Sequence, residues 1–249
     1  MGRKISNILI VLFSAVIIFS GYKLWTIFSE YHESKKQYEE TAERHVHKKD
    51  PDNTMDEYGP QTCPITVDFE ELLKENKDVV GWIYSEDTPI NYPVLRGETN
   101  DTYLHHMIDG RYNSAGSIFM DTDNNPDLTD FNTVLYGHHM KNGSMFASLH
   151  KYKKQEYYDE HKFMWYLTPK HTYRLDVMSG FIEDPEAKVY SPFPEKEMLD
   201  EFITYAQSKS NFVPEHVQED IDGIFVLSTC TYEYNDARYI VICVPVMTD

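Results

Sequence analysis

The sequence of 249 residues has few cysteines, few positive charges, and no internal repeat or low-complexity tract. Its three cysteines cannot form a disulfide framework, and at least one of them must be a free thiol. Lys and Arg number 23 against 41 Asp and Glu, and the formal net charge is −18. Nucleic-acid binding depends on Lys and Arg that neutralise phosphates, so this composition argues against a nucleic-acid partner.

Aromatic residues, by contrast, are plentiful, with 19 Tyr and 13 Phe. Aromatic side chains are enriched in strands, so the composition favours a β-rich fold over a helical bundle. The length suffices for one sizeable domain with appendages.

The N-terminus predicts a membrane anchor. Residues 5–22 contain no charge, and as a helix these 18 residues would span roughly 27 Å, close to the hydrocarbon thickness of a bilayer. Arg3 and Lys4 precede the run, so the positive-inside rule places residues 1–4 in the cytoplasm, residues 5–28 in the membrane and the rest outside. A cleavable signal peptide and a buried core helix are the alternatives.

Residues 29–62 are strongly charged and nearly free of aliphatic side chains. We expect a partly helical stalk that ends at Asp50-Pro51 and lifts the domain off the membrane. His45 and His47 could bind a metal, but no further ligand stands at a familiar spacing, so a solvated pair is favoured.

Residues 63–249 predict one catalytic domain that is mostly β. A short amphipathic helix is expected at 67–73, and a clearer one at 194–206, where apolar residues recur at helical spacing. Many short strands with few helices favour a mostly antiparallel barrel or sandwich. The expected strands are 79–84, 90–95, 117–120, 132–136, 163–167, 173–178, 223–229 and 239–246.

Cys230 closes a hydrophobic strand, and Arg238 opens the next one after a polar loop. An antiparallel return would make the two residues face each other at the mouth of a hairpin. A neighbouring guanidinium favours the thiolate and can stabilise an oxyanion. From these residues alone, a buried structural cysteine beside a salt-bridging arginine is an equally good interpretation.

The other cysteines are predicted to be structural. Side chains alternate along a strand, so Cys243 points away from the face that carries Arg238 and is expected in the core. Ser228 shares the face of Cys230. Cys63 lies beside Pro64 at the domain edge, and nothing indicates a role for it.

A cysteine nucleophile usually requires an imidazole, and Tyr136-Gly137-His138-His139 is the distinctive candidate. Taken alone, this motif favours a polar turn with two exposed histidines, and a zinc site lacks ligands at a familiar spacing. The remaining histidines of the domain have no motif around them and are expected at the surface: His105, His106, His150, His161 and His171.

These motifs together resemble class B sortases. The resemblance covers roughly residues 65–246 and includes the 194–206 helix before the cysteine strand. One departure is Val226-Leu227, where the family usually has Thr-Leu before Ser-Thr-Cys. The segments that carry the resemblance are Gly81-Trp82-Ile83, Ile90 to Val94, Asn100 through Tyr103-Leu104, Tyr136-Gly137-His138, Asn142 to Phe146, Leu227 to Cys230, and Arg238.

The resemblance implies an eight-stranded sortase-type β-barrel with N-terminal helices and one helix in the loop before the cysteine strand. It implies Cys230 as the nucleophile, His138 rather than His139 as the catalytic histidine, and Arg238 as the arginine. Positions that line the family's sorting-signal groove are Asn100, Leu104, Tyr190 and Ser228.

The implied reaction is a transpeptidation that needs no metal or organic cofactor. Cys230 would attack the Thr carbonyl of a C-terminal sorting motif in a secreted protein, and an amine of peptidoglycan or of a pilin would take the acyl group. The product would be a protein anchored to the wall of a Gram-positive cell. A hydrolytic cysteine peptidase that uses the same residues, and a non-catalytic extracytoplasmic binding module, remain as alternatives.

Overall fold

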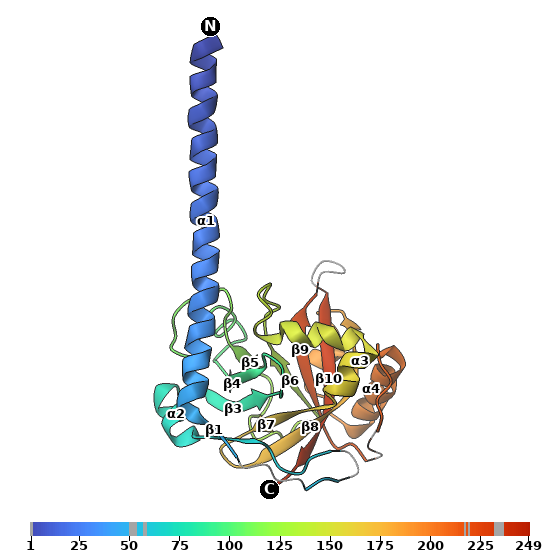
Figure 1. Ribbon diagram of the computed structural model, residues 1–249. Coiled ribbons are helices and arrows are strands. Elements are labelled where there is room, and N and C mark those ends of the chain that lie inside the picture. The colour runs from blue at the N-terminus through green and yellow to red at the C-terminus, as the bar shows by residue number, and fades with distance from the viewer. Residues whose placement is uncertain (1, 50–53, 57–58, 217, 219, 232–236) are drawn as a thin grey trace.

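The computed structural model describes residues 2–49, 54–56, 59–216, 218, 220–231 and 237–249. One long helix leaves a compact β-rich body (Figure 1). The helices are α1 (Gly2–His45), α2 (Phe69–Glu75), η1 (Phe146–Lys153), α3 (Gln155–Glu160), η2 (Lys188–Tyr190) and α4 (Lys196–Lys209). The strands are β1 (Val46–Lys48), β2 (Ile65–Val67), β3 (Val79–Tyr84), β4 (Asn91–Leu95), β5 (Ile118–Met120), β6 (Asn132–Tyr136), β7 (Phe163–Leu167), β8 (Thr172–Glu183), β9 (Ile224–Cys230) and β10 (Arg238–Met247).

Eight of these strands close into a barrel in the order β10-β8-β7-β3-β4-β5-β6-β9. The barrel is mixed, because β4 pairs with β5 and β6 pairs with β9 in parallel. The eight-stranded barrel, the N-terminal helices and the helix before the cysteine strand confirm the predicted fold class. A parallel pair needs a crossover connection, so the residues between β4 and β5, and between β6 and β9, are free to build the surroundings of a site.

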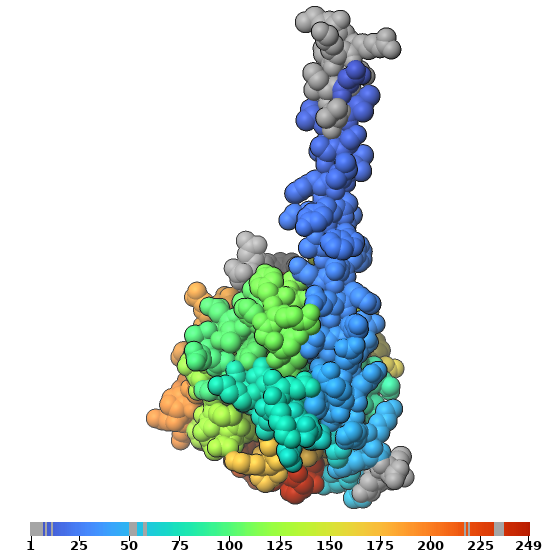
Figure 2. Space-filling model, turned by 90° about the vertical axis from the view of Figure 1, so that its left-hand side faces the viewer, coloured from blue at the N-terminus to red at the C-terminus, as the bar shows by residue number. Residues whose placement is uncertain are grey.

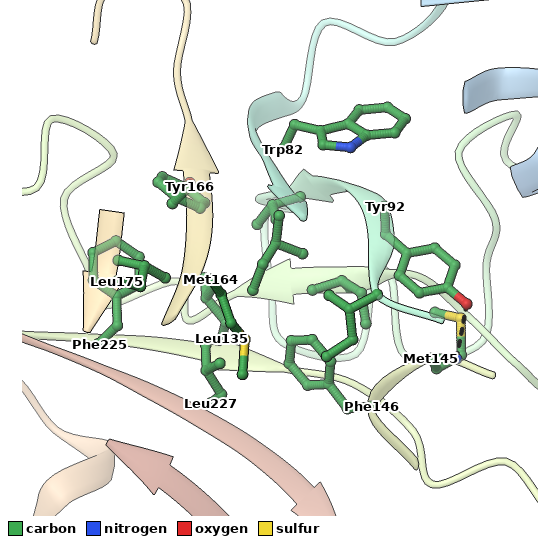
Figure 3. Close-up of a cluster of buried hydrophobic side chains, with 14 of the residues drawn as sticks. Trp82, Tyr92, Leu135, Met145, Phe146, Met164, Tyr166, Leu175, Phe225 and Leu227 are labelled. Atoms are coloured by element: carbon green, nitrogen blue, oxygen red, sulfur yellow. Dashed lines mark hydrogen bonds between the residues drawn. The ribbon is translucent and has the colours of Figure 1, made fainter. Parts of the chain in front are cut away.

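The interior is filled by large apolar side chains that alternate with outward-facing ones along each strand. Figure 3 shows part of this cluster, where Tyr166 of β7 and Phe225 of β9 meet with ring centroids 4.9 Å apart. A second apolar layer lies outside the barrel, where α4 covers β8, β9 and β10 through Leu199 and Ala206. The β9–β10 hairpin is therefore buried on both faces along most of its length.

β8 runs further than the sequence predicts, to Glu183 rather than to residue 178. Ser179 and Gly180 lie beyond the predicted end of the strand, yet both belong to it. The reason is packing: a Cβ on Gly180 would lie 2.9 Å from the hydroxyl of Tyr239. Glycine is present because β10 and its neighbours approach closely, not because the chain turns.

The first part of α1 extends away from the barrel. Its large apolar side chains are exposed, from Leu9 to Phe28. Among the described residues, α1 is the one helix long and apolar enough to be a candidate membrane span. Exposure of this kind is what a bilayer, rather than water, accommodates.

The last part of α1 differs from the expected free stalk, because it packs against the barrel (Figure 2). Ser34, Tyr38, Thr41 and His45 recur on one helix face and are buried. The Tyr38 hydroxyl donates to the Gly116 carbonyl at 2.6 Å. The charged segment conceals this buried stripe, because the members of the stripe are small, aromatic or polar rather than aliphatic.

His45 also differs from the expected solvated histidine. Its ring is buried, and Nε2 lies 3.0 Å from the Glu75 carboxylate in α2. The chain then forms β1, which pairs with β2 and ends the helix five residues before Asp50-Pro51. That dipeptide lies outside the described residues.

Candidate active site

The register of three neighbouring strands brings the predicted site residues into one row. In the parallel β6–β9 ladder Tyr136 is opposite Ser228, and the Gly137 amide donates to the Ser228 carbonyl at 3.1 Å. Two residues further along each chain are His138 and Cys230, which line the same pocket. In the antiparallel ladder Cys230 is the direct partner of Arg238. Adjacent strands are about 4.8 Å apart, so the thiol lies between an imidazole and a guanidinium.

All three side chains project from the outer face of the barrel. Val226 and Ile240 belong to the layer under α4, and the period of two places Cys230 and Arg238 on that same face. At the end of the hairpin that carries Cys230 and Arg238, the connection after β8 lies over the sheet in place of α4, and it leaves a hollow instead of a packed layer. The site is therefore the incompletely covered end of an otherwise buried sheet face.

The hollow is a pocket of about 160 Å³. His138, Cys230 and Arg238 all line it. Its other walls include three of the four predicted groove residues, namely Leu104, Tyr190 and Ser228. The Tyr190 and Ser228 hydroxyls are 3.2 Å apart, and burial raises the pKa of Tyr190, so that phenol stays neutral.

Asn100 does not line the pocket and lies one layer behind it. Its amide nitrogen donates to the Asp121 carboxylate at 3.0 Å, and its side-chain oxygen accepts from the Thr122 amide at 2.9 Å. The Tyr136 hydroxyl donates to the same Asp121 oxygen at 2.8 Å. Tyr136 stacks on Tyr190, with ring centroids 6.0 Å apart, so Asn100 reaches the pocket through two intermediates.

His138 is held as a neutral ring with a defined tautomer. Its Nε2 lies 2.8 Å from the Leu104 carbonyl, and because a carbonyl only accepts, Nε2 carries the hydrogen. Burial lowers the pKa of His138 below 6.5, and the nearby His105 and Arg238 lower it further, whereas the bond to Leu104 opposes them. The neutral ring therefore presents Nδ1 as its basic nitrogen.

His139 lies on the other side of the strand end. Its Nδ1 donates to the Cys230 carbonyl at 3.1 Å, and His150 Nε2 donates to the same oxygen at 3.1 Å. The two rings are 4.3 Å apart between centroids. His139 thus holds the backbone of Cys230, while His138 shares a pocket with its side chain.

Gly137 precedes the histidine pair because no other residue fits there. A Cβ at this position would lie 2.5 Å from Ile118 Cδ1 and 2.7 Å from the Phe146 ring. The strand end can approach the barrel core closely only without a side chain. This approach lets the chain that follows β6 stay against β9, where the Gly137 amide bonds to Ser228 directly before His138.

The remaining cysteines lie away from the pocket. Cys243 is fully buried in the barrel interior, and burial raises the pKa of its thiol far above the usual value. Cys63 is also buried, which raises the pKa of its thiol to about 12. In the part of the chain that the structure describes, no three His, Cys, Asp or Glu side chains converge as metal ligands.

Three residues near the site had no motif to reveal them. His105 stacks on His138 with ring centroids 5.5 Å apart, and the His150 ring lies tilted against that of His139. Both were expected at the surface, yet both are half-buried. Glu183 is the partner of Arg238 in the β8–β10 ladder. Each comes from a distant segment, so only the barrel closure reveals its position.

Comparison with known proteins identifies close relatives. The family model described as "Sortase domain" matches residues 83–246. Sortase B of Staphylococcus aureus is 31% identical over 235 residues, which cover 94% of this chain and 93% of the relative. Sortase B of Listeria monocytogenes is 32% identical over 245 residues, which cover 97% and 95%. The crystal structure of sortase B from Bacillus anthracis in complex with AAEK1 is similar at a TM-score of 0.74 and 31% identity, covering 89% of this chain and 100% of that one.

Proposed function

Because the chain belongs to the sortase family and is a class B cysteine transpeptidase, we propose that it anchors secreted proteins to the cell wall. In this proposal it cleaves a C-terminal sorting motif after a threonine and transfers the acyl group to an amine of peptidoglycan. The observation that carries the proposal is the row His138–Cys230–Arg238 in one pocket. A base, a nucleophile and a cation in adjacent positions are what acyl transfer requires.

The first step forms the acyl-enzyme. Neutral His138 takes the thiol proton of Cys230 at Nδ1, and the sulfur attacks the threonine carbonyl carbon. The C–S bond forms as the peptide C–N bond breaks, and the proton passes from His138 to the departing amine. The Leu104 carbonyl keeps the imidazole in the tautomer that this transfer needs.

Arg238 stabilises the negative charge that develops on the carbonyl oxygen. Its guanidinium comes from the strand position directly opposite Cys230, so it is in place before the substrate arrives. Arginine keeps its charge at every working pH and presents several donors in a fixed plane.

The walls of the pocket hold the sorting motif. Leu104 gives an apolar surface, whereas the Tyr190 and Ser228 hydroxyls can donate to or accept from the peptide backbone. Asn100 acts indirectly, since its bond to Asp121 fixes Tyr136 beneath Tyr190.

The N-terminal helix supports a membrane location for the enzyme in this proposal. The exposed apolar part of α1 crosses the membrane once, and the barrel lies outside the cell. In Figure 1 the Cys230 end of β9 and the free end of α1 point the same way, which supports a pocket that faces the membrane.

Mass spectrometry of the full-length protein with Asn-Pro-x-Thr-type peptides tests the proposal. We expect the intact mass to rise by that of the peptide up to its threonine, and the adduct to disappear in Cys230→Ala. Added amine should convert the adduct into an amide product. If only the hydrolysed peptide forms, even with amine present, the protein is a peptidase and the proposal is wrong.

A further inference from the structure

We propose that a second groove, between α1 and the segment that follows His138, binds the peptide that supplies the accepting amine. This inference rests on the proposed function, because a transpeptidase needs a place for its second substrate. The groove has a volume of about 770 Å³. One wall is the face of α1 from Ser34 to Glu43, and the other runs from His139 to Lys151.

The groove and the catalytic pocket meet at the histidine pair. His138 lines the pocket, whereas His139, the next residue, lines the groove. The His139 ring also donates to the Cys230 carbonyl, so one end of the groove lies against the backbone of the nucleophile. A peptide in the groove therefore has one end at His139, one residue from the histidine that shares a pocket with the thiol.

The groove is built on fixed elements. Its floor includes Tyr38 and Tyr92, whose rings meet edge to face at 5.3 Å. The Tyr92 hydroxyl accepts the Met145 amide at 3.0 Å and so holds the outer wall, as the dashed line in Figure 3 shows. Met145 adopts φ of 57°, an unfavourable conformation for a residue with a side chain. This bond holds the groove in shape before a ligand arrives.

Charges of both signs line the rim. Glu39 and Glu43 come from α1, whereas Lys35, Lys141 and Lys151 are the positive residues. Lys35 and Glu39 are 3.6 Å apart and both exposed, and such pairs exchange partners at little cost. The pattern suits a short peptide that carries carboxylates as well as an amine, which is the chemistry of a peptidoglycan stem peptide.

The length of the groove agrees with that occupant. Ser34 and Glu43 are nine residues apart on one helix, which corresponds to about 14 Å. An extended peptide rises about 3.3 Å per residue, so about four residues fit along the helix. A single amine-bearing small molecule would leave most of the groove empty.

The transfer step balances with the groups present. The amine nitrogen attacks the thioester carbonyl carbon, and the C–N bond forms as the C–S bond to Cys230 breaks. His138 takes the proton from the amine and returns it to the leaving sulfur. The groove supplies binding and direction, and the pocket supplies the chemistry.

The test separates the two half-reactions in the full-length protein in detergent micelles. Acylation is followed by mass spectrometry without amine, and transfer is followed with L-Ala-D-Glu-meso-diaminopimelate or with triglycine as the acceptor probe. For Glu39→Gln/Glu43→Gln we expect an acceptor KM at least fivefold higher and an acylation rate within twofold of wild type. Ala42→Trp, which fills the groove from α1, should raise the acceptor KM at least tenfold.

Glu40 provides a matched control on the same helix. It pairs with Lys36 at 3.7 Å, as Glu39 pairs with Lys35, but lies outside the groove. Glu40→Gln and Glu40→Trp should leave both half-reactions unchanged. The proposal is overturned if the groove variants keep the wild-type acceptor KM, if the Glu40 variants change it equally, or if acylation falls instead. A wild-type protein that forms no acyl-enzyme refutes the proposed function itself, which is a different result.

Discussion

On the outer face of the β9–β10 hairpin Cys230 opens into a pocket beside Arg238, whereas on the inner face Cys243 is enclosed by the barrel core. The two thiols are thirteen residues apart in the sequence and lie on neighbouring strands. What separates them is strand parity, because the period of two sends them to opposite sides of one sheet.

Burial has opposite consequences on the two faces. In the core it raises the pKa of the Cys243 thiol, so that no thiolate forms and the side chain behaves as a small apolar group. In the pocket it lowers the pKa of His138, so that the ring is neutral and able to accept a proton. The same desolvation keeps the Cys243 thiol protonated and the His138 ring unprotonated.

The largest expected effect comes from the histidine pair. His138→Ala removes the base from the outer face and should lower the acylation rate by about 10² to 10⁴-fold, the usual contribution of general acid–base catalysis. Stopped-flow or quenched mass spectrometry of acyl-enzyme formation measures it. His139→Ala should have a much smaller effect, because His150 still holds the Cys230 carbonyl. An inactive His139→Ala with an active His138→Ala would reverse the assignment.

Arg238→Ala should have the next largest effect. Removing a preorganised oxyanion donor costs about 10² to 10³-fold in kcat, and we expect a loss of this size in acylation. Arg238→Lys keeps the charge but loses the planar donor set, so its rate should fall between wild type and Arg238→Ala. The kcat and KM for the sorting peptide report the result. Equal activity of all three proteins would show that the oxyanion is stabilised elsewhere.

Periodicity and motif together predict that His138, Cys230 and Arg238 belong to one site. The residues around them come together only when the barrel closes. The alternation along residues 239–246 is enough to separate Cys243 from Cys230. The parallel β6–β9 pairing was not predicted, and it is this pairing that aligns His138 with Cys230. A parallel neighbour cannot be read from local sequence, because its crossover spans the 87 residues 137–223 between the two strands.

The segment before the barrel shows the other limit of prediction. Charge and the lack of aliphatic residues predict a stalk at 29–62, yet Tyr38 and Thr41 of α1 are buried against the barrel. One helix face can be buried while its charged residues remain exposed on the others. The partner surface, residues 111–117, is assembled only by the fold.

Cys243→Ala tests the role of the cysteine on the inner face. The substitution removes one buried sulfur and should lower the free energy of unfolding by roughly 1 kcal/mol, with an acylation rate within twofold of wild type. Urea denaturation followed by tryptophan fluorescence measures the first quantity. A Cys243→Ala protein that is stable but inactive would contradict the division between the two faces.

The smallest expected effect is a shift in the pH dependence of acylation. It distinguishes the effect of burial on the pKa of His138 from the effect of a neighbouring charge. The base is the deprotonated ring, so acylation rises with pH through the pKa of His138, and the acid limb should lie below 6.5 because burial lowers that pKa. His105→Ala admits water and removes a neighbouring positive charge, and both changes move the limb to higher pH. His105→Phe keeps the stacked ring and removes only the charge, so its shift has the same sign and is smaller. The kcat/KM profile for acylation measures the three midpoints. Because burial is the largest cause of the lowered pKa, a His105→Phe shift equal to that of His105→Ala would contradict the view that a dry pocket keeps His138 neutral.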